Sequence, residues 1–370
     1  MILPPKTIGI IGGGQLGRMM AISARYMGYK VAVLDPTPNC PTAQVADVQL
    51  TAAYDDKDAI KELTKISDVV TYEFENVDLE AAAYIEAQGK LPQGALALEI
   101  TQNREKEKTM IKELGLPVPK FAIVNSGEEA KTALEDFSLP AVIKTCSGGY
   151  DGKGQLKLEI ETDKEEAIRF AEEQQHCIIE DWITFDKEIS VVFSRRASGE
   201  IAFFPISENE HRDHILYKTT VPATVNKEIQ KKAYHAAELL AEKMNIVGTF
   251  AIEMFVHGEE IYLNEMAPRP HNSGHYSIEA CNVSQFDQHI LAISGLPLKE
   301  TALLQPAVMV NVLGEDVEGL LEYLQTTTKG HSHLYGKAEI KQKRKMGHIT
   351  FIGEDEEDVQ QQVKQYEETK

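Results

Sequence analysis

Between residues 7 and 88, short apolar runs alternate with segments of helical character. The pattern predicts strands at residues 7–12 (TIGIIG), 30–35 (KVAVLD) and 68–72, and helices at residues 15–27, 56–64 and 78–88. Strands that alternate with helices pair in parallel, because each helix returns the chain to the same end of the sheet. We therefore expect an α/β domain of about 100 residues built on a doubly wound parallel sheet.

The rest of the chain mixes helices with hairpins, which is an α+β pattern. A charged helix over residues 101–114 ends at Gly115, and Pro117 and Pro119 follow it as stop signals that mark a boundary. Beyond it we expect strands at 139–143 and 177–182, hairpins pairing 188–196 with 201–206 and 249–256 with 261–266, and a helix at 226–244. Strands at 307–312 and 347–352 and a helix at 316–324 complete a small, mixed C-terminal region.

Composition narrows the possible partners. The 370 residues include 38 Lys and Arg against 58 Asp and Glu, for a formal charge of −20. Such a surface repels nucleic acid and anionic lipid, so we expect neither as a partner. The isolated cysteines favour reduced thiols, and the chain shows no leader and no apolar run of membrane-spanning length. A cytoplasmic protein is the expectation.

A glycine-rich segment, KTCSGGYDGKGQ at residues 144–155, follows the expected strand at 139–143. Glycines at this density let backbone N–H groups converge on an anion without interference from Cβ atoms, and two lysines add positive charge. The Walker spacing is absent, so nucleotide binding here needs another geometry. On these residues alone two interpretations stay open: a phosphate-binding loop, or a hairpin tip with surface lysines.

The segment GGGQLG at residues 12–17 matches GxGxxG between a strand and a helix, and Asp35 ends the next strand. This pattern is typical of dinucleotide sites, so an NAD-dependent oxidoreductase is one candidate function. A helix N-terminus without side chains attracts any phosphate or carboxylate, however. Glu73, Glu75 and Asn76 follow the third strand, at the sheet edge where ligands of α/β proteins bind. They could hold a ribose and a base, or form a solvated strand end.

The predicted hairpin of residues 249–266 places Glu253 and Glu265 among apolar residues. If its turn centres near Glu259, the two carboxylates become cross-strand neighbours, with Cβ atoms about 4.5–5.5 Å apart. Like charges so placed destabilise a sheet unless a cation neutralises them, and Mg²⁺ suits carboxylate and phosphate oxygens. We therefore expect these glutamates to bind Mg²⁺, with Asn264 as a further contact; two solvated glutamates are the alternative.

Three more polar groups accompany this hairpin. The loop after it carries Arg269, His271, Asn272, Ser273 and His275, donors that suit an anionic intermediate. The strand at 177–182 ends with Glu180, Asp181 and Trp182, and Ile183 and Glu188 follow it. The backbone N–H and C=O groups at this strand edge could hydrogen-bond to adenine, and Glu188 could bind the ribose hydroxyls. The basic cluster of Lys337, Lys341, Lys343, Arg344 and Lys345 is either a solvated patch or a pocket for a substrate phosphate.

Taken together, these segments resemble the ATP-grasp superfamily, in which two α+β lobes clamp ATP. Within it, GGGQLGRM, YEFENV, SGGYDGKGQ, NEMAPRPHNSGH and RKMGH look like the 5-(carboxyamino)imidazole ribonucleotide synthase family of purine biosynthesis, and the resemblance spans residues 8 to about 350. It implies an ATP-grasp fold with three parts. These are a Rossmann-like domain (1–108), an ATP-grasp domain (109–297, with a lid lobe at about 119–183) and a C-terminal domain (298–370).

The activity implied by the resemblance is ATP-dependent carboxylation of 5-aminoimidazole ribonucleotide by bicarbonate, through carboxyphosphate. This is a C–N ligase reaction with small-molecule partners, Mg²⁺ and a homodimeric enzyme. ATP would contact Arg104, Lys144, Gly149, Tyr150, Asp151, Gly152, Lys153, Gly154, Gln155, Glu180, Asp181, Trp182, Ile183, Glu188, Asn264 and Glu265. Lys144, Tyr150, Lys153, Arg269 and His271 would be catalytic, and Gln15, Leu16, Glu73, Asn76, His275, Lys337, Arg344 and Lys345 would bind the ribonucleotide.

One position departs from the wider superfamily. Many ATP-grasp enzymes carry Asn two residues after the second metal-binding glutamate, where this chain has Ala267. The resemblance then implies that Glu253, Glu265 and water bind the metal, and the synthase family shares this Ala. A formate-using glycinamide ribonucleotide transformylase is a closer alternative function than the oxidoreductase, and a non-enzymatic ATP sensor would leave the polar loop 269–275 without a role.

Overall fold

The alternating N-terminal segment forms the predicted parallel sheet in the computed structural model, which describes residues 1–148 and 154–369. The strand order is β3-β2-β1-β4, and each pairing is parallel. Its strands β1, β2 and β4 are buried along almost their whole length, which explains why they read as continuous apolar runs. The strands are β1 (Thr7–Ile11), β2 (Lys30–Leu34), β3 (Val48–Leu50) and β4 (Val69–Tyr72), with helices α1 (Gln15–Tyr26), α2 (Lys57–Ile66) and α3 (Leu79–Ala87).

The helix predicted over residues 101–114 was wrong at its start. Helix α4 (Leu96–Thr101) ends there, and a separate helix α5 (Arg104–Glu113) begins after Asn103. The Asn103 backbone is extended, with φ −137°, and its side chain accepts the N–H of Lys106 as an N-cap. The end was predicted correctly, because Gly115 adopts a positive φ of 71° directly after the helix.

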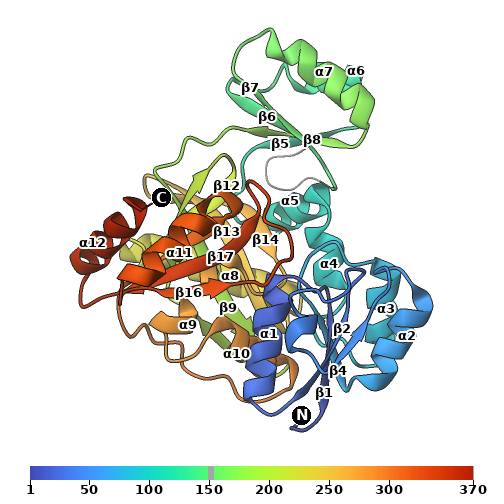
Figure 1. The fold of residues 1–370 in the computed structure, drawn as a ribbon. Coiled ribbons are helices and arrows are strands. Elements are labelled where there is room, and N and C mark those ends of the chain that lie inside the picture. Colours follow the sequence, from blue (N-terminus) through green and yellow to red (C-terminus); the bar gives the residue numbers. More distant parts are fainter. Residues whose placement is uncertain (149–153, 370) are drawn as a thin grey trace.

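A small antiparallel sheet and two helices lie within residues 119–183, the part of the chain predicted to be the lid lobe. Its order is β5-β8-β6-β7, and helices α6 and α7 cover one face of it, so that the lobe stands apart from the rest of the molecule (Figure 1). Ser126 caps α6 by accepting the N–H of Glu129. The elements are β5 (Phe121–Val124), α6 (Gly127–Ala133), β6 (Ala141–Thr145), β7 (Gln155–Leu158), α7 (Asp163–Gln174) and β8 (Cys177–Asp181).

The largest sheet runs β14-β13-β9-β11-β12-β15-β17-β16, with β10 paired to β9. Both predicted hairpins are confirmed, whereas the hairpin of β11 and β12 was not predicted. The C-terminal strand β15 pairs with β12, so the sheet continues into the predicted C-terminal region. The strands are β9 (Lys187–Arg195), β10 (Ile201–Phe203), β11 (Ser207–Arg212), β12 (Ile215–Val221), β13 (Gly248–His257), β14 (Glu260–Ala267), β15 (Ala307–Leu313), β16 (His331–Leu334) and β17 (Lys345–Ile352).

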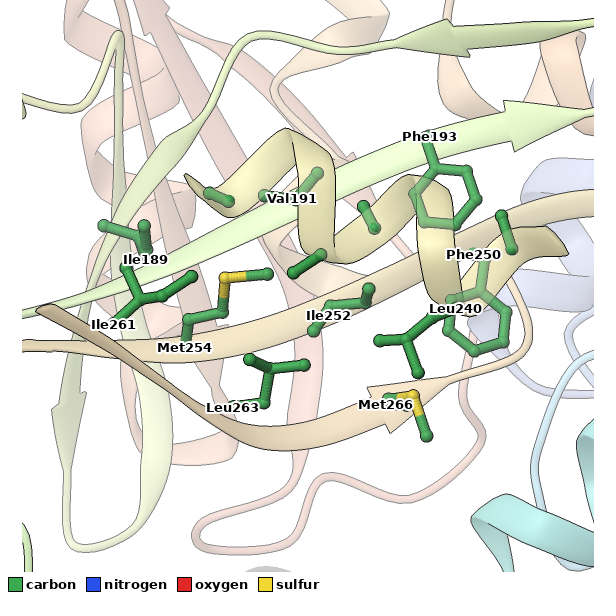
Figure 2. Packing of buried hydrophobic residues seen from close by; sticks show 14 of the residues in the cluster. Ile189, Val191, Phe193, Leu240, Phe250, Ile252, Met254, Ile261, Leu263 and Met266 are labelled. Atoms are coloured by element: carbon green, nitrogen blue, oxygen red, sulfur yellow. The ribbon is translucent and has the colours of Figure 1, made fainter. Parts of the chain in front are cut away.

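Helix α8 (Lys227–Lys243) packs on one face of β9, β13 and β14 to form the central core. Phe193, Phe250, Ile252 and Leu240 are fully buried there (Figure 2). Burying side chains of this size stabilises the fold by about 1.5–3 kcal/mol each. The remaining helices are α9 (Ser277–Ala280), α10 (Gln285–Ile293), α11 (Val317–Thr326) and α12 (Glu356–Glu367), with short 3₁₀ turns η1 (Ala43–Val45), η2 (Asn272–Gly274) and η3 (Gly314–Asp316). In the described part of the chain, no helix is both long and apolar enough to cross a membrane.

Candidate active site

The predicted cross-strand pair of carboxylates is present. Glu253 on β13 lies opposite Glu265 on β14, on the sheet face away from α8. This register depends on a β-bulge: Met254 pairs with Leu263, so Asn264 is an extra residue between the two pairs. Without the bulge, Glu253 would lie opposite Asn264, and strand alternation would turn Glu265 toward the core.

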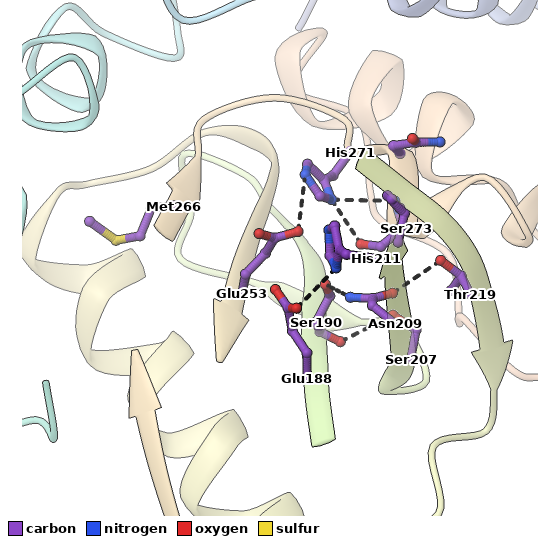
Figure 3. A network of polar contacts seen from close by, with 12 residues as sticks. Glu188, Ser190, Ser207, Asn209, His211, Thr219, Glu253, Met266, His271 and Ser273 are labelled. Carbon is purple, nitrogen blue, oxygen red and sulfur yellow. Dashed lines mark hydrogen bonds and ion pairs between the residues drawn. The ribbon is translucent and has the colours of Figure 1, made fainter. Parts of the chain in front are cut away.

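Glu188 on β9 and His211 on β11 lie beside Glu253. The Nδ1 atom of His211 is 2.9 Å from Glu188 Oε2, and potential ligand atoms of the three residues all lie within 4.8 Å of one another (Figure 3). Burial and the neighbouring charges of Glu188 and Glu265 raise the pKa of Glu253 to about 8. Accumulated negative charge of this kind favours a bound cation.

His271 faces this cluster from the polar loop after β14. Its Nε2 is 3.6 Å from Glu253 Oε1, while its Nδ1 accepts the backbone N–H of Ser273 at 3.3 Å (Figure 3). Burial, followed by the positive charge of Arg269, lowers the pKa of His271 well below its ordinary value. The ring is therefore neutral at pH 7 with its proton on Nε2, where it can donate a hydrogen bond toward the cluster.

Arg269 lies close to Glu75, and the two form an ion pair across the boundary between β14 and the N-terminal sheet. Glu75 is one of the two acids predicted at the carboxyl edge of that sheet. The pair therefore joins the polar loop after β14 to the edge at which ligands of α/β proteins bind.

A second charged group lies between the lid lobe and the central sheet. Lys144 Nζ is 2.6 Å from Glu180 Oε2, and the buried Lys108 Nζ is 3.5 Å from Glu180 Oε1. Burial would raise the pKa of Glu180, but Lys108 and Lys144 outweigh it and lower that pKa to about 2. Burial lowers the pKa of Lys144, with Glu180 opposing the shift. Arg104 joins this end of β6, because its backbone N–H donates to the Cys146 carbonyl at 2.8 Å.

The rest of the predicted nucleotide contacts lie around this group. Trp182, just after β8, stacks under the Lys157 ammonium at 4.4 Å from the ring centre. Asp181, Ile183 and Asn264 are partly exposed and so accessible. Gly154 and Gln155 return the chain from the glycine-rich segment into β7, which pairs with β6 through Lys144 and Gln155. The predicted contacts Gly149, Tyr150, Asp151, Gly152 and Lys153 lie outside the described residues.

The GxGxxG loop uses its backbone donors within the chain. Glu73 accepts the N–H groups of Gly14 and Gly17, the latter at 2.8 Å, and Asp35 accepts that of Gly13 at 2.7 Å. Burial raises the pKa of Glu73, and its two backbone hydrogen bonds oppose that shift. A Cβ atom at position 14 would come within 2.6 Å of Glu73 Oε1, so glycine is required for this close approach. The loop thus binds two carboxylates, those of Asp35 and Glu73, which follow strands of its own sheet.

The predicted phosphate pocket brings the two ends of the chain together. Gly336 accepts a hydrogen bond from Gln44 Nε2 at 2.8 Å. Tyr335 of the same loop belongs to one buried cluster with Leu16, which follows Gln15 at the start of α1. Lys337 donates to the Lys345 carbonyl at 2.6 Å. Burial and the nearby Arg344 charge lower the pKa of Lys337 to about 8, which places these basic groups together.

Asn76 and His275 are two further predicted ribonucleotide contacts. Asn76 is exposed at the edge of the N-terminal sheet. His275 is 1% exposed, with its ring among Phe286, Tyr335 and His348 and its Nδ1 3.1 Å from the side-chain nitrogen of Gln285. The structure therefore places His275 among groups that support the polar loop.

Three residues around these groups were missed by sequence reasoning: His211, Glu107 and Lys108. His211 lies on a strand whose buried positions are the polar Ser207 and Asn209, so no apolar alternation marks it. Glu107 and Lys108 were interpreted as part of a charged helix. The sequence carries only a weak signal for them. They lie three and four residues after Arg104, which places them on the same helix face as this predicted ATP contact.

The chain matches family models in three consecutive parts. Residues 5–102 match the ribonucleotide synthetase preATP-grasp domain, residues 109–286 the ATP-grasp domain, and residues 307–362 the phosphoribosylaminoimidazole carboxylase C-terminal domain. The N5-carboxyaminoimidazole ribonucleotide synthase of Bacillus subtilis is 50% identical over 364 residues, covering 98% of this chain and 96% of its own.

Solved structures show a similarity to the same family. An ADP complex of an N5-carboxyaminoimidazole ribonucleotide synthetase is similar with a TM-score of 0.96 at 51% identity, covering 99% of this chain and 97% of that one. The Aspergillus clavatus N5-carboxyaminoimidazole synthase, in complex with ADP and 5-aminoimidazole ribonucleotide, has a TM-score of 0.91 at 30% identity, with 98% of each chain covered. The chain has the ATP-grasp fold and belongs to the N5-carboxyaminoimidazole ribonucleotide synthase family of ATP-dependent ligases.

Proposed function

We propose that this enzyme uses ATP to carboxylate the amine of 5-aminoimidazole ribonucleotide with bicarbonate, forming N5-carboxyaminoimidazole ribonucleotide, ADP and phosphate in purine biosynthesis. The observation that carries the proposal is the facing pair Glu253 and Glu265, next to Glu188 and within reach of the polar loop. The ligands named for the related Aspergillus clavatus structure support the choice of nucleotide and substrate.

The donor set fits Mg²⁺. Glu253 and Glu265 offer hard carboxylate oxygens on one face of the sheet. Burial, followed by the charges of Glu188 and Glu265, raises the pKa of Glu253 to about 8, and a bound cation would stabilise its charged form. These two residues would hold the ion, with Glu188 beside them. When bound, Mg²⁺ would supply positive charge to the triphosphate oxygens.

The residues proposed for ATP come from both the lid lobe and the central sheet. Lys144 would neutralise the phosphates, and Glu180 sets the position of its ammonium at 2.6 Å. Asp181, Trp182 and Ile183 would hold the adenine at the end of β8. The catalytic roles of Tyr150 and Lys153, which lie outside the described residues, remain predictions from the family resemblance.

The reaction would proceed in two steps. A bicarbonate oxygen attacks the γ-phosphorus, the bond to the β-phosphate oxygen breaks, and carboxyphosphate and ADP form. The amine nitrogen of the ribonucleotide then bonds to the carboxyl carbon, directly or after release of CO₂; phosphate leaves and the nitrogen loses a proton. Arg269 and neutral His271 would donate hydrogen bonds to the carboxyphosphate oxygens, which stabilises charge as it develops.

The ribonucleotide would bind between the N-terminal sheet and the C-terminal loop. Lys337, Arg344 and Lys345 would bind its phosphate, next to Gln15 and Leu16. Glu73 and Asn76 remain predicted contacts to the ribose and the base. This arrangement gives the start of α1 a role in substrate binding, in place of the dinucleotide role of the alternative oxidoreductase.

The decisive experiment measures ADP release while ATP, bicarbonate and 5-aminoimidazole ribonucleotide are omitted in turn. We expect full turnover only when all three are present. A parallel reaction with formate and glycinamide ribonucleotide tests the closest alternative, the transformylase. ADP release in that mixture and none with bicarbonate would refute the proposal.

Three further features belong to the proposal. The four cysteines are free thiols, which supports the predicted cytoplasmic location. The homodimer is proposed from the family resemblance, and light scattering on the purified chain tests it. The domain boundaries at residues 108/109 and 297/298 also remain predictions, which limited proteolysis can check.

A further inference from the structure

Two adjacent charged residues of helix α5 are buried against the central sheet. Glu107 is 3% exposed and Lys108 is 2% exposed, whereas their neighbour Lys106 has about half of its side chain in solvent. Charged side chains are almost never buried so completely unless they are paired or hydrogen-bonded. Their partners therefore identify what they do.

Both residues bind the backbone of β14 on either side of Glu265. The Lys108 ammonium donates to the carbonyl oxygens of Leu263 at 3.3 Å and Asn264 at 2.8 Å. Glu107 Oε1 accepts the backbone N–H of Met266 at 2.8 Å. Asn264 and Met266 are the immediate neighbours of Glu265, and Leu263 precedes Asn264.

The same short segment contains the β-bulge. Before it, Ile261 and Leu263 face the core under α8; after it, Met266 faces the core and Glu265 the opposite side, toward Glu253. A bulged residue is left out of the regular ladder, so its backbone groups need other partners. Lys108 is the partner of the Asn264 carbonyl, and Glu107 binds the N–H of Met266, two residues further on, so the two side chains bind on both sides of the position where the face of the strand changes.

Lys108 also contacts the nucleotide side of the site. Its ammonium lies 3.5 Å from Glu180 Oε1, and Glu180 in turn pairs with Lys144. One buried ammonium thus links the backbone of the bulge to the charged group proposed for ATP. Helix α5 thus contacts both halves of the proposed site.

We infer that Glu107 and Lys108 are positioning residues, which hold the β14 bulge in the register at which Glu265 faces Glu253. The inference rests on the proposed metal role of these two glutamates. Neither positioning residue needs to touch the metal or the substrate. Their effect is to keep the Glu265 carboxylate on the correct face of the sheet.

The test compares Glu107→Met and Lys108→Met, which remove the hydrogen bonds, with Glu107→Gln, which keeps an acceptor oxygen for the Met266 N–H. Lys106→Met is the matched control on the exposed side of the same helix. Calorimetry measures Mn²⁺ affinity in the presence of a non-hydrolysable ATP analogue, and hydrogen exchange follows the amides of residues 263–266. A thermal melt establishes that each variant is folded.

We expect Mn²⁺ to bind roughly 10–100-fold more weakly to the two positioning variants, with faster exchange at residues 263–266, as for other residues that orient metal ligands. Glu107→Gln and Lys106→Met should match the wild type. A folded Glu107→Met with wild-type Mn²⁺ affinity would overturn the inference, even if Lys108→Met fails to fold. A wild-type chain that binds Mn²⁺ with the nucleotide but never carboxylates the ribonucleotide would refute the proposed function and leave this inference standing.

Discussion

The carboxylate of Glu73 accepts the backbone N–H of Gly17 at 2.8 Å, at the N-terminus of helix α1. The positive end of the helix dipole thus faces an anion that belongs to the protein itself. In a dinucleotide site this position belongs to the pyrophosphate. A GxGxxG motif in this chain is therefore compatible with a function other than NAD binding.

The first prediction concerns this choice of ligand. MgATP should raise the thermal midpoint of unfolding, because a ligand that binds only the folded state stabilises it. NADH at the same concentration should leave the midpoint unchanged, because Glu73 and Asp35 already bind the N–H groups of the loop. Stabilisation by NADH in a thermal shift assay, with none by MgATP, would instead favour the oxidoreductase.

The substitution Glu265→Gln should reduce ADP release at least about 100-fold, because it removes one charge from the proposed metal site. Binding of 5-aminoimidazole ribonucleotide, measured by calorimetry, should be unchanged. Glu260→Gln, at the exposed start of the same strand, is the control and should turn over normally. Unchanged turnover in Glu265→Gln would exclude its role in metal binding.

Lys337→Met should raise the KM for the ribonucleotide by roughly 10–100-fold, the effect of losing one charge-assisted hydrogen bond to a phosphate. The KM for ATP should not change, since ATP is proposed to bind at the lid lobe. Lys341→Met removes an exposed lysine of the same loop and serves as the control. Equal effects of Lys337→Met on both KM values would argue against a separate phosphate pocket.

Glu180→Gln should destabilise the protein by about 3–5 kcal/mol, because the buried Lys108 and the largely buried Lys144 would lose their anionic partner. Glu159→Gln breaks the solvent-exposed pair with Lys157 and should cost less than about 1 kcal/mol. Urea unfolding of the two variants makes the comparison. Similar losses of unfolding free energy in the two variants would show that the buried ion pairs stabilise the fold no more than the exposed pair does.

Histidine 289 should make the fold sensitive to acid. Burial lowers its pKa from 6.5 to about 3, and its Nδ1 accepts the backbone N–H of Thr249 at 3.0 Å. Only the unfolded chain takes up this proton near pH 5, so the stabilisation is complete above pH 6.5 and is lost as the pH falls toward 3. Between pH 7 and pH 5 the loss is about 2 kcal/mol. In His289→Gln the fall in unfolding free energy should be smaller by that amount; an equal fall would contradict the assignment.

Local patterns predicted several elements correctly, for reasons the structure makes plain. Asp56 and Asp78 cap the helices that follow them, and the buried parallel strands read as apolar runs. The hairpin of β13 and β14 was also placed correctly. Strand β11 was missed because its inward positions, Ser207 and Asn209, are polar; Asn209 donates to Ser190 Oγ at 2.6 Å and accepts the hydroxyl of Thr219 (Figure 3).

The amino-acid sequence by itself determined the residues with site chemistry and their order along the chain. It predicted that Glu253 and Glu265 would face each other, and that Lys144 and the glycine-rich segment would follow a buried strand. Only the tertiary structure decided that Glu188 and His211 join Glu253, and that Glu107 and Lys108 hold the bulge that orients Glu265. Those contacts join residues far apart in the chain, and a one-residue bulge reverses the face of a strand, which no local pattern of residues records.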